Sequence, residues 1–452
     1  MQSVNPATGR VMAEYPPHSP RAAQDAVTAA SLSQKTWAAL SVADRARGLV
    51  AVAEVLDRRL AEYAALITSE MGKPGSEARA EVAKCAAVCR FYAEHGPTML
   101  ADRAVATEAA RSLVMHEPLG LVLAIMPWNF PFWQVMRLAA PALMAGNGFV
   151  LKHAENVPGS ALALEQLFRE AGLPSDLVRT LLISEPEVEP ILARAEVRAV
   201  ALTGSARAGR AVAALAGGLL KKSILELGGC DPLIVLEDAD LTACCAAALE
   251  SRMKNAGQTC TAAKRLLLAE PLAQEFEERL LALARGLRLG DPTDPATDMG
   301  PLARADIREA LHDQVQRSLA AGARLVLGGV LPDGPGYFYP PTILAGVRPG
   351  MAVFEEETFG PLAAITTFKD EEEAVALANA SAYGLGASIW TADPARGEAL
   401  ARRMEAGTVM VNAQTRSDFR LPFGGVKDSG WGRELSHYGI RELSAVKTLW
   451  VA

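Results

Sequence analysis

One cysteine of the chain lies among small, polar, turn-forming residues. Residues 255–264 read Asn-Ala-Gly-Gln-Thr-Cys-Thr-Ala-Ala-Lys and separate a helical pattern from the strand-like run 266–268. A thiol in such a loop can be hydrated and deprotonated, whereas a thiol on an apolar stripe behaves as a small hydrophobic group. Cys260 is therefore the candidate nucleophile, and the alternative is a loop cysteine without a chemical role.

Two other polar groups are expected at the same cleft. The run 223–227 leads into a pair of glycines, which puts the Glu226 carboxylate at a strand end, where it can take up a proton or activate water. The turn at 127–131, Pro-Trp-Asn-Phe-Pro, would hold the Asn129 amide at the cleft mouth. A donor aimed at a developing oxyanion is commonly worth ~3 kcal/mol. In isolation, Asn129 would more often be an ordinary turn residue.

Composition limits the classes of function. The chain has 452 residues, half of them hydrophobic, which predicts two or more domains. No run of about 18 uncharged apolar residues and no secretory signal is visible, so we expect a cytoplasmic protein away from membranes. The net charge of -7, with scattered basic residues, argues against nucleic acid as a partner. The six cysteines lack Cys-x-x-Cys spacing, so reduced thiols and no metal site are expected.

The elements that position these groups follow from hydrophobic periodicity. The first hundred residues are mainly helical, with a capped start at Ser41 and a break at 72–75. In the helix expected near 76–95, Cys85 and Cys89 share one face, which indicates core packing.

From residue 121 onward, strands and helices alternate, as in parallel sheets covered on both faces. The first series of expected strands is 121–125, 148–151, 181–183, 199–202 and 224–227, with helices after Pro131 and from Ser160 and Ser205. A second series runs from Leu233 to about Val411. This pattern predicts a two-domain α/β enzyme with its cleft between the domains. Residues 104–118 read as an extended hairpin.

The motifs 226–229 (Glu-Leu-Gly-Gly) and 257–260 (Gly-Gln-Thr-Cys) together resemble the aldehyde dehydrogenase superfamily, and further matches run from Asn5 to the C-terminus. The resemblance implies an α/β fold with two Rossmann-type domains, an oligomerisation hairpin and a C-terminal strand. We expect a discontinuous NAD-binding domain at residues 1–102 and 120–228, interrupted by the oligomerisation hairpin at 103–119. A catalytic domain would follow at 229–430, and a C-terminal segment at 431–452 would complete the oligomerisation region. A homodimer or homotetramer is implied.

The resemblance also implies the chemistry. Cys260 would attack an aldehyde, Glu226 would take the thiol proton or activate the hydrolytic water, and Asn129 with the backbone N–H of Cys260 would stabilise the oxyanion. Glu434 matches a residue implicated in proton passage, although a surface role is nearly as consistent with the sequence.

The cofactor is expected on a strand-helix turn. Thr203, Gly204 and Ser205 follow a strand and open a helix, with Gly209 one turn further, so a pyrophosphate could approach the helix N-terminus. As a bare pattern this is equally a tight turn, and the resemblance favours binding. It also assigns to the cofactor Trp128, Leu227, Gly228, Glu357 and Phe359. Three adjacent glutamates at 355–357 are otherwise typical of a solvated face.

The choice between NAD and NADP is expected to depend on the residues that follow the strand predicted at 148–151. Glu155 can accept hydrogen bonds from both ribose hydroxyls and would repel a 2'-phosphate, which favours NAD. Lys152 supplies positive charge that could rescue some use of NADP.

The substrate prediction comes from Trp133 and Arg137, which share a helix face at i,i+4. An arginine pointing into an aldehyde tunnel would bind a distal carboxylate through two hydrogen bonds. Here the chain is similar to short bacterial succinate-semialdehyde dehydrogenases, which implies Ser417 as a second carboxylate ligand and Thr259 as a further substrate contact. A structural salt bridge of Arg137, another aldehyde such as glutarate semialdehyde, CoA acylation and a non-catalytic protein are the alternatives.

Overall fold

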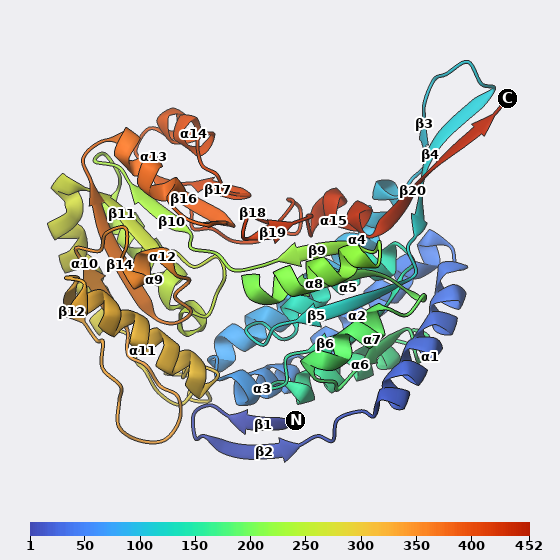
Figure 1. The fold of residues 1–452 in the computed structure, drawn as a ribbon, viewed down its shortest axis with the longest axis horizontal. Helices are drawn as coiled ribbons and strands as arrows, with labels where there is room; N and C mark the ends of the chain where they lie inside the picture. The colour runs from blue at the N-terminus through green and yellow to red at the C-terminus, as the bar shows by residue number, and fades with distance from the viewer.

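Two sheets lie in separate lobes of the computed structural model, which describes residues 1–452 (Figure 1). The first sheet has the order β19-β9-β8-β5-β6-β7 and the second has the order β12-β13-β14-β11-β10-β16-β17. In each sheet all neighbouring strands are parallel except at one edge, where β19 and β12 run antiparallel to their neighbours. The predicted α/β class is confirmed.

The strands of the first sheet are the expected apolar runs: β5 (Leu121–Met126), β6 (Gly148–His153), β7 (Val178–Thr180), β8 (Val197–Thr203), β9 (Lys222–Glu226) and β19 (Gly430–Trp431). Nearly all residues of β5 and β6 are buried, because helices cover both faces of a parallel sheet. The predicted position of one strand, 181–183, is wrong, because the observed strand β7 begins and ends three residues earlier. Ladder hydrogen bonds hold Val178–Thr180, and the buried apolar run after it is irregular.

The second sheet contains β10 (Pro232–Val235), β11 (Arg265–Ala269), β12 (Arg324–Leu327), β13 (Thr342–Ala345), β14 (Leu362–Phe368), β16 (Gly386–Trp390) and β17 (Thr408–Val411). Two small sheets pair β1 (Gln2–Asn5) with β2 (Arg10–Glu14) and β15 (Tyr383–Gly384) with β18 (Val426–Lys427). Residues 227–231 connect the two large sheets. The predicted domain boundaries stay predictions, and β19 joins the first sheet from the C-terminal part of the chain.

A third sheet projects from the first lobe (Figure 1). It has the order β20-β4-β3, with β3 (Arg103–Ala104), β4 (Arg111–Pro118) and β20 (Ser444–Val451). The predicted hairpin is therefore present, and all eight residues of β20 pair with β4.

The helices are α1 (Pro20–Ala38), α2 (Val42–Arg58), α3 (Leu60–Met71), α4 (Gly75–Met99), α5 (Trp133–Met144), α6 (Pro158–Glu170), α7 (Val188–Leu192), α8 (Ala206–Gly218), α9 (Leu241–Met253), α10 (Ala273–Arg285), α11 (Ala305–Ala320), α12 (Ala352–Glu355), α13 (Glu371–Asn379), α14 (Pro394–Ala401) and α15 (Ser436–Glu442). Short 3-10 helices are η1 (Glu185–Glu187), η2 (Lys254–Gly257) and η3 (Glu270–Leu272). Ser41 caps α2 by accepting from the Asp44 N–H at 3.1 Å, as expected. No helix is long and apolar enough to cross a bilayer.

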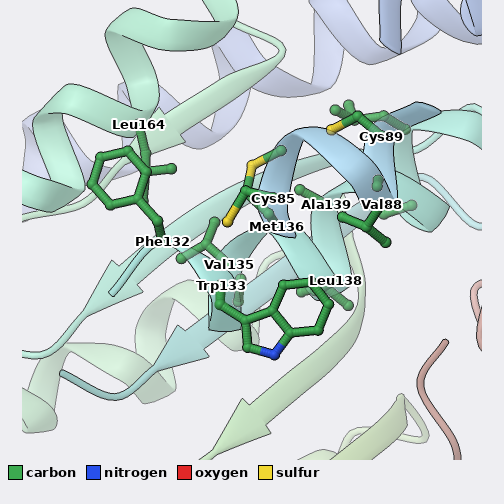
Figure 2. Close-up of a cluster of buried hydrophobic side chains, with 14 of the residues drawn as sticks. Cys85, Val88, Cys89, Phe132, Trp133, Val135, Met136, Leu138, Ala139 and Leu164 are labelled. Atoms are coloured by element: carbon green, nitrogen blue, oxygen red, sulfur yellow. The ribbon is translucent and has the colours of Figure 1, made fainter. Parts of the chain in front are cut away.

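Helix α4 packs against α5 in the core of the first lobe (Figure 2). Cys85 and Cys89 are fully buried there among side chains of α5, so their shared face is a packing surface, as predicted. Burial raises the pKa of both thiols well above the ordinary value of a cysteine.

A buried ion pair fixes the start of α5. Lys73 Nζ lies 2.5 Å from Glu81 Oε2, and both side chains are almost inaccessible to solvent. Glu81 Oε1 accepts hydrogen bonds from the backbone N–H groups of Phe132 and Trp133 at 2.9 and 3.0 Å. One carboxylate therefore connects α4, the break at 72–75 and the first turn of α5.

Replacing Glu81 with Ala is expected to lower stability by about 3–5 kcal/mol, because Lys73 would be left buried without the carboxylate of its ion pair. The melting temperature measured by calorimetry should fall by several degrees. The double variant Lys73→Met/Glu81→Gln should recover much of that loss. As a control, Asp25→Ala removes a solvent-exposed pair with Arg21 and should have almost no effect. A Glu81→Ala protein as stable as the parent would contradict this account.

Candidate active site

The loop that carries Cys260 follows a backbone of unusual conformation. In η2, Asn255 and Ala256 have φ values of 54° and 50°, and Gly257 has a φ of +72°. A Cβ atom on Gly257 would lie 2.1 Å from the carbonyl oxygen of Gly360, so only glycine fits. This tight turn brings Cys260 to the wall of a pocket, where its side chain is partly exposed.

The Asn129 turn is hydrogen-bonded to this loop. Asn129 Nδ2 donates to the carbonyl of Gln258 at 3.1 Å, and Asn255 Nδ2 donates to the carbonyl of Asn129 at 2.8 Å. Gln258 in turn accepts at Oε1 from the Ala303 N–H at 2.9 Å. The predicted oxyanion donor and the predicted nucleophile thus belong to one hydrogen-bonded unit.

The Cys260 thiol is hard to ionise in this structure. Burial raises its pKa to about 11, and the positive charges of Lys264 and Arg137 act in the opposite direction. Lys264 is itself fully buried, and its Nζ donates to the Cys260 carbonyl at 2.9 Å, the Gly229 carbonyl at 2.5 Å and Glu357 Oε1 at 2.6 Å. Lys264 was not predicted from the sequence, although a lysine four residues after the candidate nucleophile is a usable signal.

Glu226 lies at the carboxyl end of β9, as expected, and is 2% exposed. Neither of its carboxylate oxygens has a hydrogen-bond partner within the protein. Burial, followed by the negative charge of Glu434, raises the pKa of Glu226 well above its ordinary value, whereas Arg137 and Arg433 lower it. A desolvated carboxyl group of this kind binds a proton readily and can serve as a general base.

Arg137 forms a buried ion pair with Glu434. Its Nη2 also donates to Thr203 Oγ1 at 3.3 Å, and its guanidinium lies 4.9 Å from the centre of the Phe423 ring. The salt-bridge alternative for Arg137 is thus present, and the surface alternative for Glu434 is wrong because this side chain is buried. Arg137 nevertheless lines the pocket, and its Nη1 makes no hydrogen bond within the protein.

The pocket beside Cys260 has a volume of about 260 Å³. Its wall contains all four predicted substrate residues, Trp133, Arg137, Thr259 and Ser417. It also contains Lys84, which the sequence analysis did not single out. No group of three or more His, Cys, Asp and Glu side chains forms a candidate metal site.

The residues predicted for the cofactor lie around the carboxyl edge of the first sheet. Ser205 caps α8 by accepting from the Ala208 N–H at 3.3 Å, so the predicted Thr203–Ser205 turn leads directly into the helix N-terminus. A Cβ atom on Gly209 would lie 2.5 Å from Leu227, so this glycine allows close helix-strand packing. Between α8 and β9 lies a second cavity of about 270 Å³, lined partly by Leu225 and Leu227. Apolar side chains in the cavity wall could contact a flat ring, and the nearby helix N-terminus could bind an anionic group.

The other predicted cofactor residues form three separate contacts. The Trp128 and Phe359 rings meet edge to face with centres 5.6 Å apart. Glu357 accepts from the Gly229 N–H at 3.1 Å, and a Cβ atom on Gly228 would lie 2.3 Å from its carboxylate. Lys152 Nζ lies 3.7 Å from Glu155, whose side chain is about half exposed. The chain therefore offers a continuous set of groups that could hold a dinucleotide.

Known proteins are similar to this chain in sequence and in fold. The family model described as "Aldehyde dehydrogenase family" matches residues 1–449. A protein of Escherichia coli K12 named succinate semialdehyde dehydrogenase [NAD(P)+] Sad is 47% identical over 99% of this chain and 97% of its own length. A Synechocystis protein named probable succinate-semialdehyde dehydrogenase [NADP(+)] is 47% identical over 100% of this chain and 99% of its own length.

Among solved structures, a succinic semialdehyde dehydrogenase of Streptococcus pyogenes in complex with NADP+ has a TM-score of 0.97 and 37% identity. It is matched over 100% of this chain and 99% of that one. The match extends over both lobes, the projecting sheet and the loops around Cys260. The chain belongs to the aldehyde dehydrogenase family.

Proposed function

We propose that this NAD(P)-dependent aldehyde dehydrogenase oxidises succinate semialdehyde to succinate. The observation that carries the proposal is the pocket beside Cys260, which combines a thiol with cationic and hydroxyl side chains at a volume suited to a small anionic aldehyde. The names of the relatives from Escherichia coli and Synechocystis support the same substrate.

In the proposed mechanism, the Cys260 thiolate attacks the aldehyde carbon. The resulting alkoxide receives hydrogen bonds from the Asn129 amide and the backbone N–H of Cys260. Because Asn129 and the nucleophile loop are hydrogen-bonded to each other, little reorganisation is needed when charge develops. Glu357, Phe359 and Trp128 would hold the nicotinamide of a bound cofactor, which would supply the hydride acceptor for the oxidation.

Glu226 would complete the reaction by activating water against the thioester. A buried carboxyl with a raised pKa has the proton affinity that this step requires. Water as the acyl acceptor also separates this proposal from CoA acylation, which needs no such base. The negative charge of Glu434 would help Glu226 to hold the proton that it takes from water.

Glu226→Gln is expected to lower steady-state turnover by about 10²–10⁴-fold, because the base that activates water is lost. Since burial raises the pKa of both Cys260 and Glu226, the parent activity should rise with pH from neutral, as protons leave. In the variant, ionisation of the Cys260 thiol alone would control the rate of the NADH burst. The pH at which this rate increases should therefore shift towards the Cys260 pKa of about 11. Stopped-flow absorbance would measure the burst, with exposed Glu189→Gln as the control. Unchanged turnover would exclude Glu226 as the base.

Arg137 and Ser417 are proposed as ligands of the substrate carboxylate. Arg137→Ala is a poor probe, because it would leave Glu434 buried without its partner beside Glu226. Arg137→Lys keeps the charge but loses the planar fork that binds a carboxylate through two hydrogen bonds.

Arg137→Lys is expected to lower kcat/KM for succinate semialdehyde by about tenfold or more, with a much smaller loss for butanal, which lacks the carboxylate. Initial rates with succinate semialdehyde, glutarate semialdehyde and butanal would measure this. The parent enzyme should prefer succinate semialdehyde. Equal losses for charged and uncharged aldehydes would remove Arg137 from carboxylate binding.

For the cofactor, we propose a preference for NAD that rests on Glu155. The names of the relatives favour NADP, but a carboxylate at the ribose would repel a 2'-phosphate. Lys152, 3.7 Å from Glu155, offsets part of that repulsion.

Glu155→Ser is expected to raise the NADP-to-NAD ratio of kcat/KM by about tenfold, because the repulsion of the phosphate is removed. Exposed Glu185→Ser on the same lobe is the control. Paired initial-rate series with NAD and NADP would decide the matter. A parent enzyme that already favours NADP would contradict the assigned role of Glu155.

The projecting sheet supports a proposed homodimer or homotetramer. Its strand β20 carries exposed Val446, Leu449 and Trp450, an arrangement typical of a surface that pairs with another copy. The cytoplasm is the proposed location.

A further inference from the structure

A lysine with no role in the proposed mechanism lines the substrate pocket. Lys84 lies on α4 and is half-buried. Its Nζ lies 4.0 Å from the centre of the Trp133 ring and donates to Ser417 Oγ at 2.8 Å and to the Ser417 carbonyl at 3.1 Å. The ammonium group is therefore held between two residues of the proposed substrate site.

The charges around the pocket leave Lys84 without a counter-charge. Arg137 is paired with Glu434, and Lys73 with Glu81. No carboxylate oxygen lies within 4.0 Å of Lys84 Nζ, because the nearby Asp418 pairs with Arg420. The other two cations of the pocket wall, Lys254 and Arg416, are exposed. Lys84 is thus the partly buried cation whose charge is free to meet an anion.

We propose that Lys84 is a specificity-determining residue that binds the distal carboxylate of the aldehyde together with the Ser417 hydroxyl. The inference rests on the proposed function and adds a ligand to it. Because Ser417 Oγ accepts a hydrogen bond from Lys84, its own hydroxyl hydrogen remains available. A carboxylate could therefore receive one hydrogen bond from the ammonium and one from the hydroxyl, and a charged donor strengthens both binding and selectivity.

The same geometry predicts a pH dependence of substrate binding. Burial lowers the pKa of Lys84 to about 8, and the charges of Arg137 on α5 and Lys254 on η2 act in the same direction. Cys85 on α4 and Asp418 on the segment before β18 act in the opposite direction. Below pH 8 the ammonium is charged and can bind the anion, and above it the charge is lost. The KM for succinate semialdehyde should therefore rise above pH 8, whereas the KM for butanal should not.

The test compares Lys84→Met, Lys84→Arg and the exposed control Lys35→Met, with succinate semialdehyde and butanal at pH 7 and pH 9. Lys84→Met should raise the KM for succinate semialdehyde by about tenfold or more at pH 7 and leave butanal kinetics unchanged, because only the anion loses its partner. Lys84→Arg should keep tight binding and abolish the rise at pH 9, since arginine stays charged.

An unchanged KM in Lys84→Met, or equal losses for both aldehydes, would overturn the inference, and equal losses would indicate a structural role. A parent enzyme that uses butanal as well as succinate semialdehyde would instead refute the proposed function itself, and the inference with it. The two failures are thus separable by the parent enzyme's own preference.

Discussion

The buried ion pair between Arg137 and Glu434 is the interaction on which the chemistry of this molecule depends. Each charge alone would cost several kcal/mol to bury, so neither residue is stable there without the other. The pair connects α5 to the segment before α15, and through Thr203 it reaches the end of β8. Its negative member raises the pKa of Glu226, while its positive member favours ionisation of Cys260. This one ion pair therefore affects both the packing of the site and the proton affinities of Glu226 and Cys260.

Helix α4 holds both the segment after the Asn129 turn and the loop that carries Cys260. Glu81 accepts from the first N–H groups of α5, next to the Asn129 turn, and Glu77 accepts from the Asn255 N–H at 2.9 Å. Lys84 follows on the same face, since residues at i, i+4 and i+7 of a helix lie in one row. All three line the pocket. The helix thus contributes two structural carboxylates and one free cation to a site whose recognisable motifs lie elsewhere.

This arrangement explains what could be predicted from the sequence. Cys260, Glu226 and Asn129 stand in short motifs at strand ends and turns, where local pattern predicts position well. The partner of Arg137 could not be predicted, because Glu434 lies almost 300 residues further along the chain and meets it only after both lobes fold. The row of Glu77, Glu81 and Lys84 was visible as charge on a mostly apolar helix face, but only packing against α5 shows that it faces a pocket. Strand β7 was predicted at the wrong residues because the apolar residues 181–183 are buried, although only Val178–Thr180 pair with β6.

The direction of proton transfer follows from where the charges lie. Burial disfavours a negative charge on both Cys260 and Glu226. Lys264, fixed by three hydrogen bonds, favours that charge on the sulfur, and Glu434 opposes it on Glu226. Lys264 thus connects the loop of Cys260 to Glu357, the residue proposed for the nicotinamide ribose.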